Sequence, residues 1–428
     1  MPDPRVSAMA DGLVGSEILR IAADVRAMIA QGAAVCNLTV GDFAPSEFRP
    51  PALLVEETVR ALRAGETNYP PSDGVLPLRQ AVKAFYEHWL GLEYPLESIL
   101  VTGGSRPGLY TTYRALVDPG ETVVYPVPSW NNNHYVHLVG ARGVPVVCHA
   151  DDAFLPTRAQ LEPLVRGARL LVLNSPLNPS GTAFSEDALA AICDLVLEEN
   201  ARRGPGERPL FLLYDQVYWM LTFAGTRHVD PVSLRPEMAD YTVFVDGISK
   251  SFAATGVRVG WIVGPADVLR RMGSILGHVG AWAPRAEQLA VAALLADTAA
   301  IEEYHGTMLR ELYARLEALH AGLTALRERG YAVEVVRPMG AIYLSVRFPL
   351  HGAVTPSGAA LHTNDDIRRY LLEAAGVAMV PFQAFGLTEE TGWFRLSVGA
   401  VSKEEIPATL ARLERALSAV APATSAAA

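Results

Sequence analysis

Residues 241–261 read YTVFVDGISKSFAATGVRVGW, and this stretch decides the fold. It opens with a run of strand-forming side chains, Tyr241 to Val245, and leads to Lys250, which stands between two serines. Runs that are apolar throughout are typical of strands buried on both faces of a parallel sheet. Ligands collect beyond the carboxyl ends of such strands, so Lys250 is predicted to face a binding site.

Lysine is rare in this chain, which makes Lys250 informative. The 36 basic residues comprise Lys83, Lys250, Lys403 and otherwise arginine. A genome preference for arginine explains the rarity, and a retained lysine is then expected where arginine cannot serve. Lysine can lose its proton and attack a carbonyl, whereas arginine stays protonated. Lys83 fits a solvated helix face and Lys403 precedes acidic residues, so Lys250 is the candidate nucleophile.

From about residue 75, apolar runs of strand length alternate with helix-length stretches. This alternation predicts an α/β fold with a mainly parallel sheet sandwiched by helices. The predicted strands lie within SILVTGG (98–104), ETVVYPVP (121–128), GVPVVCHA (143–150), RLLVLNSP (169–176), PLFLLYDQVY (209–218) and YTVFVDGISK (241–250).

The two ends of the chain have other patterns. Residues 16–32 have helical apolar spacing, and a long helical stretch is predicted from Arg285 to Gly330, followed by alternating segments. These segments predict a smaller α+β domain. We expect an N-terminal segment (1–45) that joins the small domain, a large domain (46–300), a small C-terminal domain (301–420) and a flexible tail (421–428).

Composition limits the possible partners. The chain has 428 residues, half of them hydrophobic, with a formal charge of −10 and a pI near 5.5, which disfavours binding to a nucleic-acid backbone. The three cysteines form no CxxC pair, which favours a reducing compartment. No signal-peptide pattern and no apolar run of the ~20 residues of a membrane span is found. We therefore expect a soluble cytoplasmic protein without nucleic-acid or membrane partners.

Polar residues directly follow several predicted strands. The segment Gly103–Arg106 (GGSR) comes between a predicted strand and a predicted helix, which suits a phosphate bound at the helix start. An ordinary strand-to-helix turn without a ligand can have the same sequence. Asp215 follows five apolar residues. It is expected either at the edge of a desolvated site, where it needs a cationic partner, or as a helix cap.

Four segments in order, NSPLNPSG (174–181), YDQVY (214–218), SKSFAATGVRVGW (249–261) and FRLSVG (394–399), resemble the class I/II aminotransferases, which are enzymes of fold type I. The resemblance covers nearly the whole chain, and the order and separation of the segments make it far more specific than any one of them. It implies a homodimer that uses pyridoxal 5'-phosphate (PLP) to transfer the amino group of an L-amino acid to a 2-oxo acid.

The resemblance also implies a role for each matched position. Lys250 resembles the lysine that holds PLP as a Schiff base and moves the substrate's α-proton, and Asp215 resembles the acid that pairs with the pyridine nitrogen. Arg395 resembles the arginine that grips the substrate's α-carboxylate in a bidentate fork. The other implied contacts are Tyr218 (also catalytic) and Asn178 at the phenolic oxygen, Gly104, Ser105, Arg106, Ser249 and Arg258 at the phosphate, Trp130 on the pyridine ring, Tyr69 at the neighbouring subunit's phosphate, and Gly41, Trp130 and Asn178 beside the substrate.

Elementary chemistry agrees with these roles. A carbanion next to a carbonyl-derived carbon needs an electron sink, and a protonated pyridine held by a carboxylate is such a sink. Attachment of an aldehyde as an imine needs a primary amine, which explains a lysine at position 250.

Some positions depart from the family pattern. Gly247 replaces a serine that often helps to bind the phosphate, Gln216 replaces an acidic residue, and Phe382 replaces a common glycine. Arg285 lies where small hydroxyl residues are usual. It is predicted either to form a surface ion pair with Glu287 or Glu303, or to contact a distal acidic group of the substrate across a dimer interface. These departures concern substrate choice more than cofactor binding.

Substrate identity is left open by the sequence. Val40, Phe43, Trp130 and Phe382 predict an apolar pocket for a neutral or aromatic side chain, whereas Arg285 leaves an acidic side chain possible. The run Asn131–Asn133 is a candidate substrate contact.

His134 and His137 have metal-like spacing, but no second ligand pair follows, so a packed helix is expected instead. Two other functions remain open: a PLP lyase, decarboxylase or synthase on the same scaffold, and a PLP-binding regulator. A regulator would need a DNA-reading module, and the acidic pI disfavours one.

Overall fold

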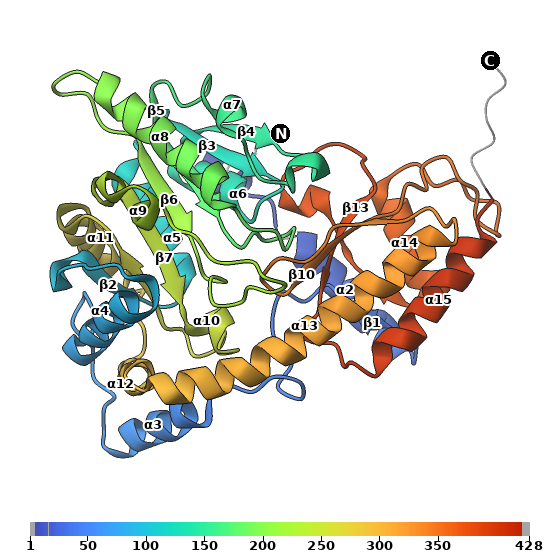
Figure 1. Cartoon of the computed structure of the whole chain (residues 1–428), viewed down its shortest axis with the longest axis horizontal. Coiled ribbons are helices and arrows are strands. Elements are labelled where there is room, and N and C mark those ends of the chain that lie inside the picture. Colours follow the sequence, from blue (N-terminus) through green and yellow to red (C-terminus); the bar gives the residue numbers. More distant parts are fainter. Residues whose placement is uncertain (1–4, 16, 422–428) are drawn as a thin grey trace.

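The computed structural model of the chain describes residues 5–15 and 17–421, and within them the largest element is a seven-stranded sheet (Figure 1). The strand order is β2-β8-β7-β6-β5-β3-β4, in which β8 alone runs antiparallel to its neighbours. The strands are β2 (Ile99–Thr102), β3 (Thr122–Val127), β4 (Arg142–Val147), β5 (Ala168–Asn174), β6 (Phe211–Asp215), β7 (Thr242–Gly247) and β8 (Gly260–Val263).

The sequence predicts these strands except β8. This strand follows the one-turn helix α10 (Ile248–Ser251) and a short loop rather than a long crossover helix, so the strand–helix alternation does not reveal it. A short connection of this kind returns the chain antiparallel to the strand before it. β8 thereby brings the segment that follows Lys250 back beside β7.

Helices flank the sheet, as expected for an α/β fold (Figure 1). They are α3 (Ala52–Arg63), α4 (Leu76–Leu90), α5 (Ser105–Leu116), α6 (Asn132–Val139), α7 (Arg158–Leu161), α8 (Glu186–Arg202), α9 (Pro231–Leu234), α11 (Ala266–Val279) and α12 (Arg285–Leu295), with 3-10 turns at Leu96–Ser98, Ala150–Asp152 and Pro236–Asp240. The strands between them are buried along nearly their whole length, except the edge strand β4.

The long helical stretch predicted after Pro284 is two helices, not one. α12 ends at Leu295 and α13 (Thr298–Glu328) begins after Asp297, whose side chain accepts a hydrogen bond from the Ala300 amide at 2.9 Å. An aspartate cap of this type satisfies free N–H groups and starts a new helix. In Figure 1, α13 then runs from the large sheet to the second sheet of the molecule.

The second sheet is antiparallel and has its own apolar core. Its order is β12-β13-β10-β9, built from β9 (Glu334–Val335), β10 (Tyr343–Arg347), β12 (Val380–Pro381) and β13 (Trp393–Ser397), with a 3-10 turn at Phe382–Phe385. Helices α14 (Asn364–Ala375) and α15 (Glu405–Ala419) lie against it together with the later turns of α13. This is the smaller α+β part that the sequence predicts.

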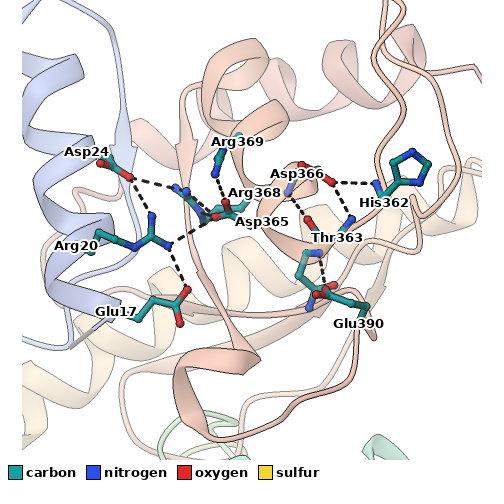
Figure 2. Close-up of polar contacts among 11 residues, drawn as sticks. Glu17, Arg20, Asp24, His362, Thr363, Asp365, Asp366, Arg368, Arg369 and Glu390 are labelled. Carbon is teal, nitrogen blue, oxygen red and sulfur yellow. Dashed lines mark hydrogen bonds and ion pairs between the residues drawn. The ribbon is translucent and has the colours of Figure 1, made fainter. Parts of the chain in front are cut away.

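The N-terminal segment lies beside this second sheet. β1 (Cys36–Asn37) pairs in parallel with β11 (Val377–Ala378), and α2 (Glu17–Ala30) contacts α14. Figure 2 shows Arg20 and Asp24 of α2 facing Asp365 and Arg368 of α14. α2 is thereby held in a position that brings Ile18 to the cavity described below.

The single-turn helix α1 (Ala8–Asp11) precedes α2 and contacts α6, where the Met9 carbonyl oxygen lies 2.7 Å from His137 Nε2. The domain boundaries at residues 45, 300 and 420 remain a prediction. Of the tail predicted for 421–428, all but Ala421 falls outside the described residues. No helix in 5–15 and 17–421 combines the length and apolar character of a bilayer-spanning segment.

Candidate active site

A cavity of about 610 Å³ opens at the carboxyl ends of β5, β6 and β7. It collects residues from both sheets, because Arg395 and Tyr343 of the smaller sheet line it together with the strand ends. The predicted site residues that line it are Gly41, Ser105, Arg106, Trp130, Asn178, Asp215, Tyr218, Ser249, Lys250, Arg258 and Arg395.

Lys250 projects into this cavity from α10, directly after β7. Its Nζ donates a hydrogen bond to the Gly41 carbonyl at 2.6 Å and lies 5.9 Å from the centre of the Tyr218 ring. The pKa of Lys250 is lowered to about 8, mainly by burial and in part by three neighbouring arginines, whereas Asp42 acts in the opposite direction. The amine is therefore much easier to deprotonate than an ordinary lysine, as a nucleophile requires.

Asp215 ends β6 at the same edge. Its carboxylate accepts a hydrogen bond from the Val217 amide at 3.2 Å, and burial raises its pKa to about 7 although Lys250 nearby favours the ionised form. A carboxylate in such surroundings gains most from a cationic partner placed against it. The alternative of an ordinary helix cap is not what the structure has, because no helix begins at Asp215.

An anion-binding corner lies where α5 begins. Gly104 has φ of 86°, and a Cβ there would lie 2.3 Å from Arg258 Nη2, so glycine is needed for the guanidinium to approach. Arg258 donates to the carbonyls of Thr255 at 2.7 Å and Gly103 at 2.9 Å, which fixes its orientation. With Ser105 at the helix start and Ser249 on the cavity wall, this corner suits a phosphate.

The departure at Gly247 has a steric reason. A Cβ at this position would lie 2.8 Å from Gly260 Cα and 2.9 Å from the Val259 carbonyl oxygen, on the adjacent strand β8. A serine would therefore push β7 and β8 apart, and Ser249 is the hydroxyl that lines the cavity instead.

Arg395 of β13 is 2% exposed, yet no carboxylate lies within ion-pair distance of it in the described part of the chain. Its guanidinium donates to the Thr39 carbonyl at 2.7 Å and to Asn178 Oδ1 at 3.1 Å, and its buried Nε has no hydrogen-bond partner. The ring of Tyr343 lies 4.6 Å from the guanidinium carbon. A buried, oriented and uncompensated arginine is the natural partner of a carboxylate ligand.

Tyr343 and Asp42 are among the cavity residues that sequence reasoning missed. The hydroxyl of Tyr343 lies 2.7 Å from that of Tyr218, and it contacts the space where a Cβ of Gly41 would lie. Asp42 accepts a hydrogen bond from Thr255 Oγ1 at 2.6 Å, and its negative charge raises the pKa of Lys250. Asp42 directly follows Gly41, which could have drawn attention to it, whereas nothing in the sequence near Tyr343 points to Tyr218.

Asn174, the last residue of β5, ties β5 to β6. Its Nδ2 donates to the Asp215 carbonyl at 2.7 Å and its Oδ1 accepts from the Asn178 amide at 2.8 Å. Trp130 forms one wall, with the Arg106 guanidinium 4.6 Å from its ring centre. Asn131 also lines the cavity, whereas Asn132 instead accepts a hydrogen bond from the Tyr113 hydroxyl.

Other predicted residues lie elsewhere. Tyr69 is 83% exposed and contacts the ring of Trp282 rather than the cavity. Arg285 forms an ion pair, as one of the two alternatives predicted, but with Glu66 at 2.6 Å and not with Glu287 or Glu303. Val40, Phe43 and Phe382 do not line the cavity, and Phe382 is fully buried in the apolar core. The apolar substrate pocket predicted from these three residues is therefore wrong, although Trp130 contributes as expected.

The fold and the cavity define a class of protein: an α/β protein with a buried lysine of lowered pKa, an anion-binding corner, and a buried arginine that has no ion-pair partner among the described residues. Comparison with known proteins gives the family. Residues 33–413 match the family model described as aminotransferase class I and II. The aspartate aminotransferase of Rhizobium meliloti (strain 1021) is 33% identical over 405 residues, which cover 94% of this chain and 93% of the relative.

Further relatives agree. The bifunctional aspartate aminotransferase and glutamate/aspartate-prephenate aminotransferase of Petunia hybrida is 30% identical over 98% of this chain and 84% of its own length. The crystal structure of the Rhizobium meliloti aspartate aminotransferase superposes with a TM-score of 0.88 at 30% identity, covering 97% of this chain and 99% of that one. The aspartate aminotransferase from Thermus thermophilus with maleate gives 0.85 at 27% identity, over 96% and 99% of the two chains.

The chain belongs to the class I and II aminotransferases, and it has the α/β architecture of PLP fold type I. It is a PLP-dependent aminotransferase, so the comparisons favour transamination over the lyase, decarboxylase and synthase reactions and over the regulator. The residues present fit the cofactor: Lys250 offers an amine of lowered pKa, Asp215 forms no ion pair within the described residues, and Gly104 leaves room for Arg258 at the anion corner.

Proposed function

We propose that Lys250 binds PLP covalently and that Asp215 pairs with the pyridine nitrogen. Arg258, Ser105, Ser249, Arg106 and the backbone at Gly104 bind the phosphate, Trp130 covers the ring, and Tyr218 with Asn178 hydrogen-bonds the phenolic oxygen. The observation that carries these roles is the convergence of all these residues on one cavity with no internal partner for the Lys250 amine beyond the Gly41 carbonyl, among the described residues.

The chain's own residues then act on the substrate in three ways. Arg395 binds the α-carboxylate, supported by the bonds that hold its guanidinium to Thr39 and Asn178. Lys250 Nζ would take the proton from the substrate's α-carbon and hold it for the transfer that completes the half-reaction. Asp215 stays ionised against the pyridine nitrogen. PLP, when bound, supplies the electron sink that makes the α-proton acidic.

For the substrate class, we propose an acidic amino acid and its 2-oxo acid. Arg106 supports this proposal, because it lines the cavity, rests against Trp130, and has no carboxylate partner within residues 5–15 and 17–421. Its guanidinium can therefore bind a distal carboxylate as well as the phosphate. The relatives named aspartate aminotransferases point the same way.

The test compares three donors, aspartate, alanine and phenylalanine, each with 2-oxoglutarate, in the wild-type protein and in Arg106→Gln. We expect aspartate to be the best donor, and Arg106→Gln to reduce kcat/KM for aspartate about tenfold or more beyond the smaller loss that weaker phosphate binding causes for alanine. Equal losses for aspartate and alanine would assign Arg106 to the phosphate alone. Failure of every donor would contradict transamination itself.

We further propose a homodimer. The face of α3 exposes Val55, Val59 and Leu62, and Tyr69 is exposed beside it, which supports burial of this face against a second copy. Tyr69 would then reach the partner's phosphate. Sedimentation should give twice the mass of one chain, and Val59→Glu should produce a monomer with little activity; a fully active monomer would exclude the shared site.

Cytoplasmic localisation also stays a prediction, supported by three buried, unpaired cysteines, as expected in a reducing compartment.

A further inference from the structure

A buried group of polar side chains lies behind the cavity, on the opposite face of the large sheet. We call it the Tyr86 cluster, and it consists of Tyr86, Gln216, Trp219, Asp246 and Trp261. Tyr86 comes from α4, and Asp246 and Trp261 from β7 and β8, while Gln216 and Trp219 follow β6. None of these residues appears among the predicted site residues.

Tyr86 is the centre of the cluster, because its hydroxyl both donates and accepts hydrogen bonds. It donates to Asp246 Oδ2 at 3.1 Å, and it accepts from Gln216 Nε2 at 3.1 Å and from Trp261 Nε1 at 3.3 Å. Burial raises the pKa of Tyr86 well above that of free tyrosine, so this hydroxyl keeps its proton.

Asp246 completes the cluster as an acceptor of three hydrogen bonds. Besides Tyr86, the indole of Trp219 donates to Oδ2 at 2.9 Å and the Gly247 amide donates to Oδ1 at 2.7 Å. The Gly247 amide is the N–H that leads into α10, so the carboxylate holds the turn that carries Lys250. Burial raises the pKa of Asp246 to about 7, opposed by these donors.

The sheet register explains why the cluster lies behind the cavity and not in it. Asp215 pairs with Val245, and Asp246 pairs with Trp261. Side chains alternate between the two faces of a strand, so Asp246 and Trp261 point away from the face that carries Asp215. Gln216 follows Asp215 in the chain and shares the face of Asp246, as its bond to Tyr86 requires.

A second contact fixes Gln216 from the outer side. His228 Nε2 lies 3.3 Å from Gln216 Oε1, and burial lowers the pKa of His228 to about 3, so the ring is neutral and can donate this bond. Gln216 is thus held through both ends of its amide. An acidic residue here would keep the His228 bond but would lose the N–H that Tyr86 accepts.

We propose that Tyr86 and Asp246 are positioning residues, which fix the ends of β6 and β7 and so set the placement of Asp215 relative to Lys250. The inference rests on the proposed roles of those two cavity residues. Its physical basis is that the Tyr86 hydroxyl joins Gln216, which follows β6, to the Asp246 carboxylate of β7. This link lies on the face of the sheet opposite the one that carries Asp215. Displacements of about 1 Å in catalytic groups reduce rates by about 10²-fold.

The test uses Tyr86→Phe in the PLP-saturated protein, which removes only the hydroxyl. We expect kcat to fall about tenfold or more with KM changed less than about threefold, because substrate binding at Arg395 is untouched. The pH midpoint of the yellow band of lysine-bound PLP should shift by about half a unit or more, since the distance between Asp215 and Lys250 sets this midpoint. Thermal unfolding of the apo-protein is measured alongside.

The matched control is Tyr370→Phe, which also removes a buried tyrosine hydroxyl, one bonded to the Ala416 carbonyl far from the cavity. If Tyr86→Phe lowers thermal stability like the control and leaves kcat and the band midpoint at wild-type values, the cluster only stabilises the fold and the inference is wrong. Should Tyr86→Phe not fold, Trp219→Phe removes one donor to Asp246 and must itself shift the midpoint by about half a unit or more. A wild-type protein without a yellow band would instead refute the proposed function.

Discussion

Two buried arginines of this chain have opposite surroundings. Arg368 and Arg395 are each 2% exposed, but Arg368 contacts Asp365 at 2.7 Å and Asp24 at 3.8 Å in the α2–α14 contact of Figure 2. Arg395 has no such partner in the described residues, and its Nε makes no hydrogen bond. The ion pairs of Arg368 compensate its burial within the fold, whereas Arg395 keeps an uncompensated charge that a ligand carboxylate can neutralise, as we propose.

The lysines repeat this contrast. Lys83 pairs with Glu87 and Lys403 with Glu311, both at the surface, whereas Lys250 has only a carbonyl within hydrogen-bond distance. The cavity thus keeps charged groups that lack ion-pair partners in the described residues, whereas Lys83, Lys403 and Arg368 are paired. Such sites reduce the stability of the empty protein in exchange for ligand binding.

The largest expected effect is that of Lys250→Ala. Covalent attachment of PLP and turnover should both be abolished, because no other group in the cavity can form the imine. The apo-protein should unfold at the same temperature as the wild type or higher, since a buried amine has been removed. Lys403→Ala is the control and should leave absorption spectrum and turnover unchanged. A coloured, active Lys250→Ala protein would contradict the assignment.

Next in size is Arg395→Gln. We expect kcat/KM to fall about 10²- to 10³-fold, because a buried, charge-assisted contact to the α-carboxylate is lost. The free energy of unfolding of the apo-protein should not fall, because the removed charge was unpaired. Steady-state kinetics and denaturant unfolding measure the two quantities. A large loss of stability without a change in kcat/KM would reverse the roles proposed for the two arginines.

Arg368→Gln should have the opposite effect to Arg395→Gln: it should lower stability and leave the kinetics unchanged. The free energy of unfolding should fall by about 1–3 kcal/mol, because Asp365 and Asp24 lose a buried partner, while Arg369 remains near Asp365. Values of kcat and KM should stay within about twofold of the wild type, since the α2–α14 contact lies outside the cavity. A selective rise in KM would show instead that the position of α2 limits substrate binding.

The smallest effect is a pH dependence. Because burial lowers the pKa of Lys250 to about 8, its ammonium loses its proton at lower pH than a free lysine does. The rate at which the apo-protein captures PLP should therefore rise about tenfold from pH 7 to 9 and then level off. A rate that keeps rising beyond pH 10 would mean an ordinary lysine. Stopped-flow absorbance measures this rate.

Much of the site could be predicted because it lies in local sequence motifs. Lys250, Asp215 and Arg258 follow apolar runs or stand in short recognisable segments, and the structure brings them to one cavity. The large sheet was predictable for the same reason, apart from β8, which lacks a crossover helix before it. The assignment of chemical roles to these residues is still a proposal, whereas the family and the fold are established by the comparisons.

What the sequence could not give depends on contacts between distant segments. Tyr343 reaches Tyr218 across 125 positions, and Tyr86 reaches Asp246 across 160. Neither Tyr343 nor Tyr86 belongs to a recognisable motif, so the sequence alone predicts only a core residue at each position. The apolar pocket expected from Phe43 and Phe382 failed for a related reason, because an aromatic side chain near a motif can pack into the core instead of the cavity.

The central claim is that the unpaired lysine of the cavity carries the cofactor, and the three lysines of the chain allow a direct test. The PLP-loaded protein is reduced with borohydride, digested, and its peptides are weighed by mass spectrometry. The account predicts a pyridoxyl-phosphate adduct on the peptide that contains Lys250 and on neither of those with Lys83 or Lys403. An adduct on Lys83 or Lys403, or no adduct from a protein that transaminates, would contradict it.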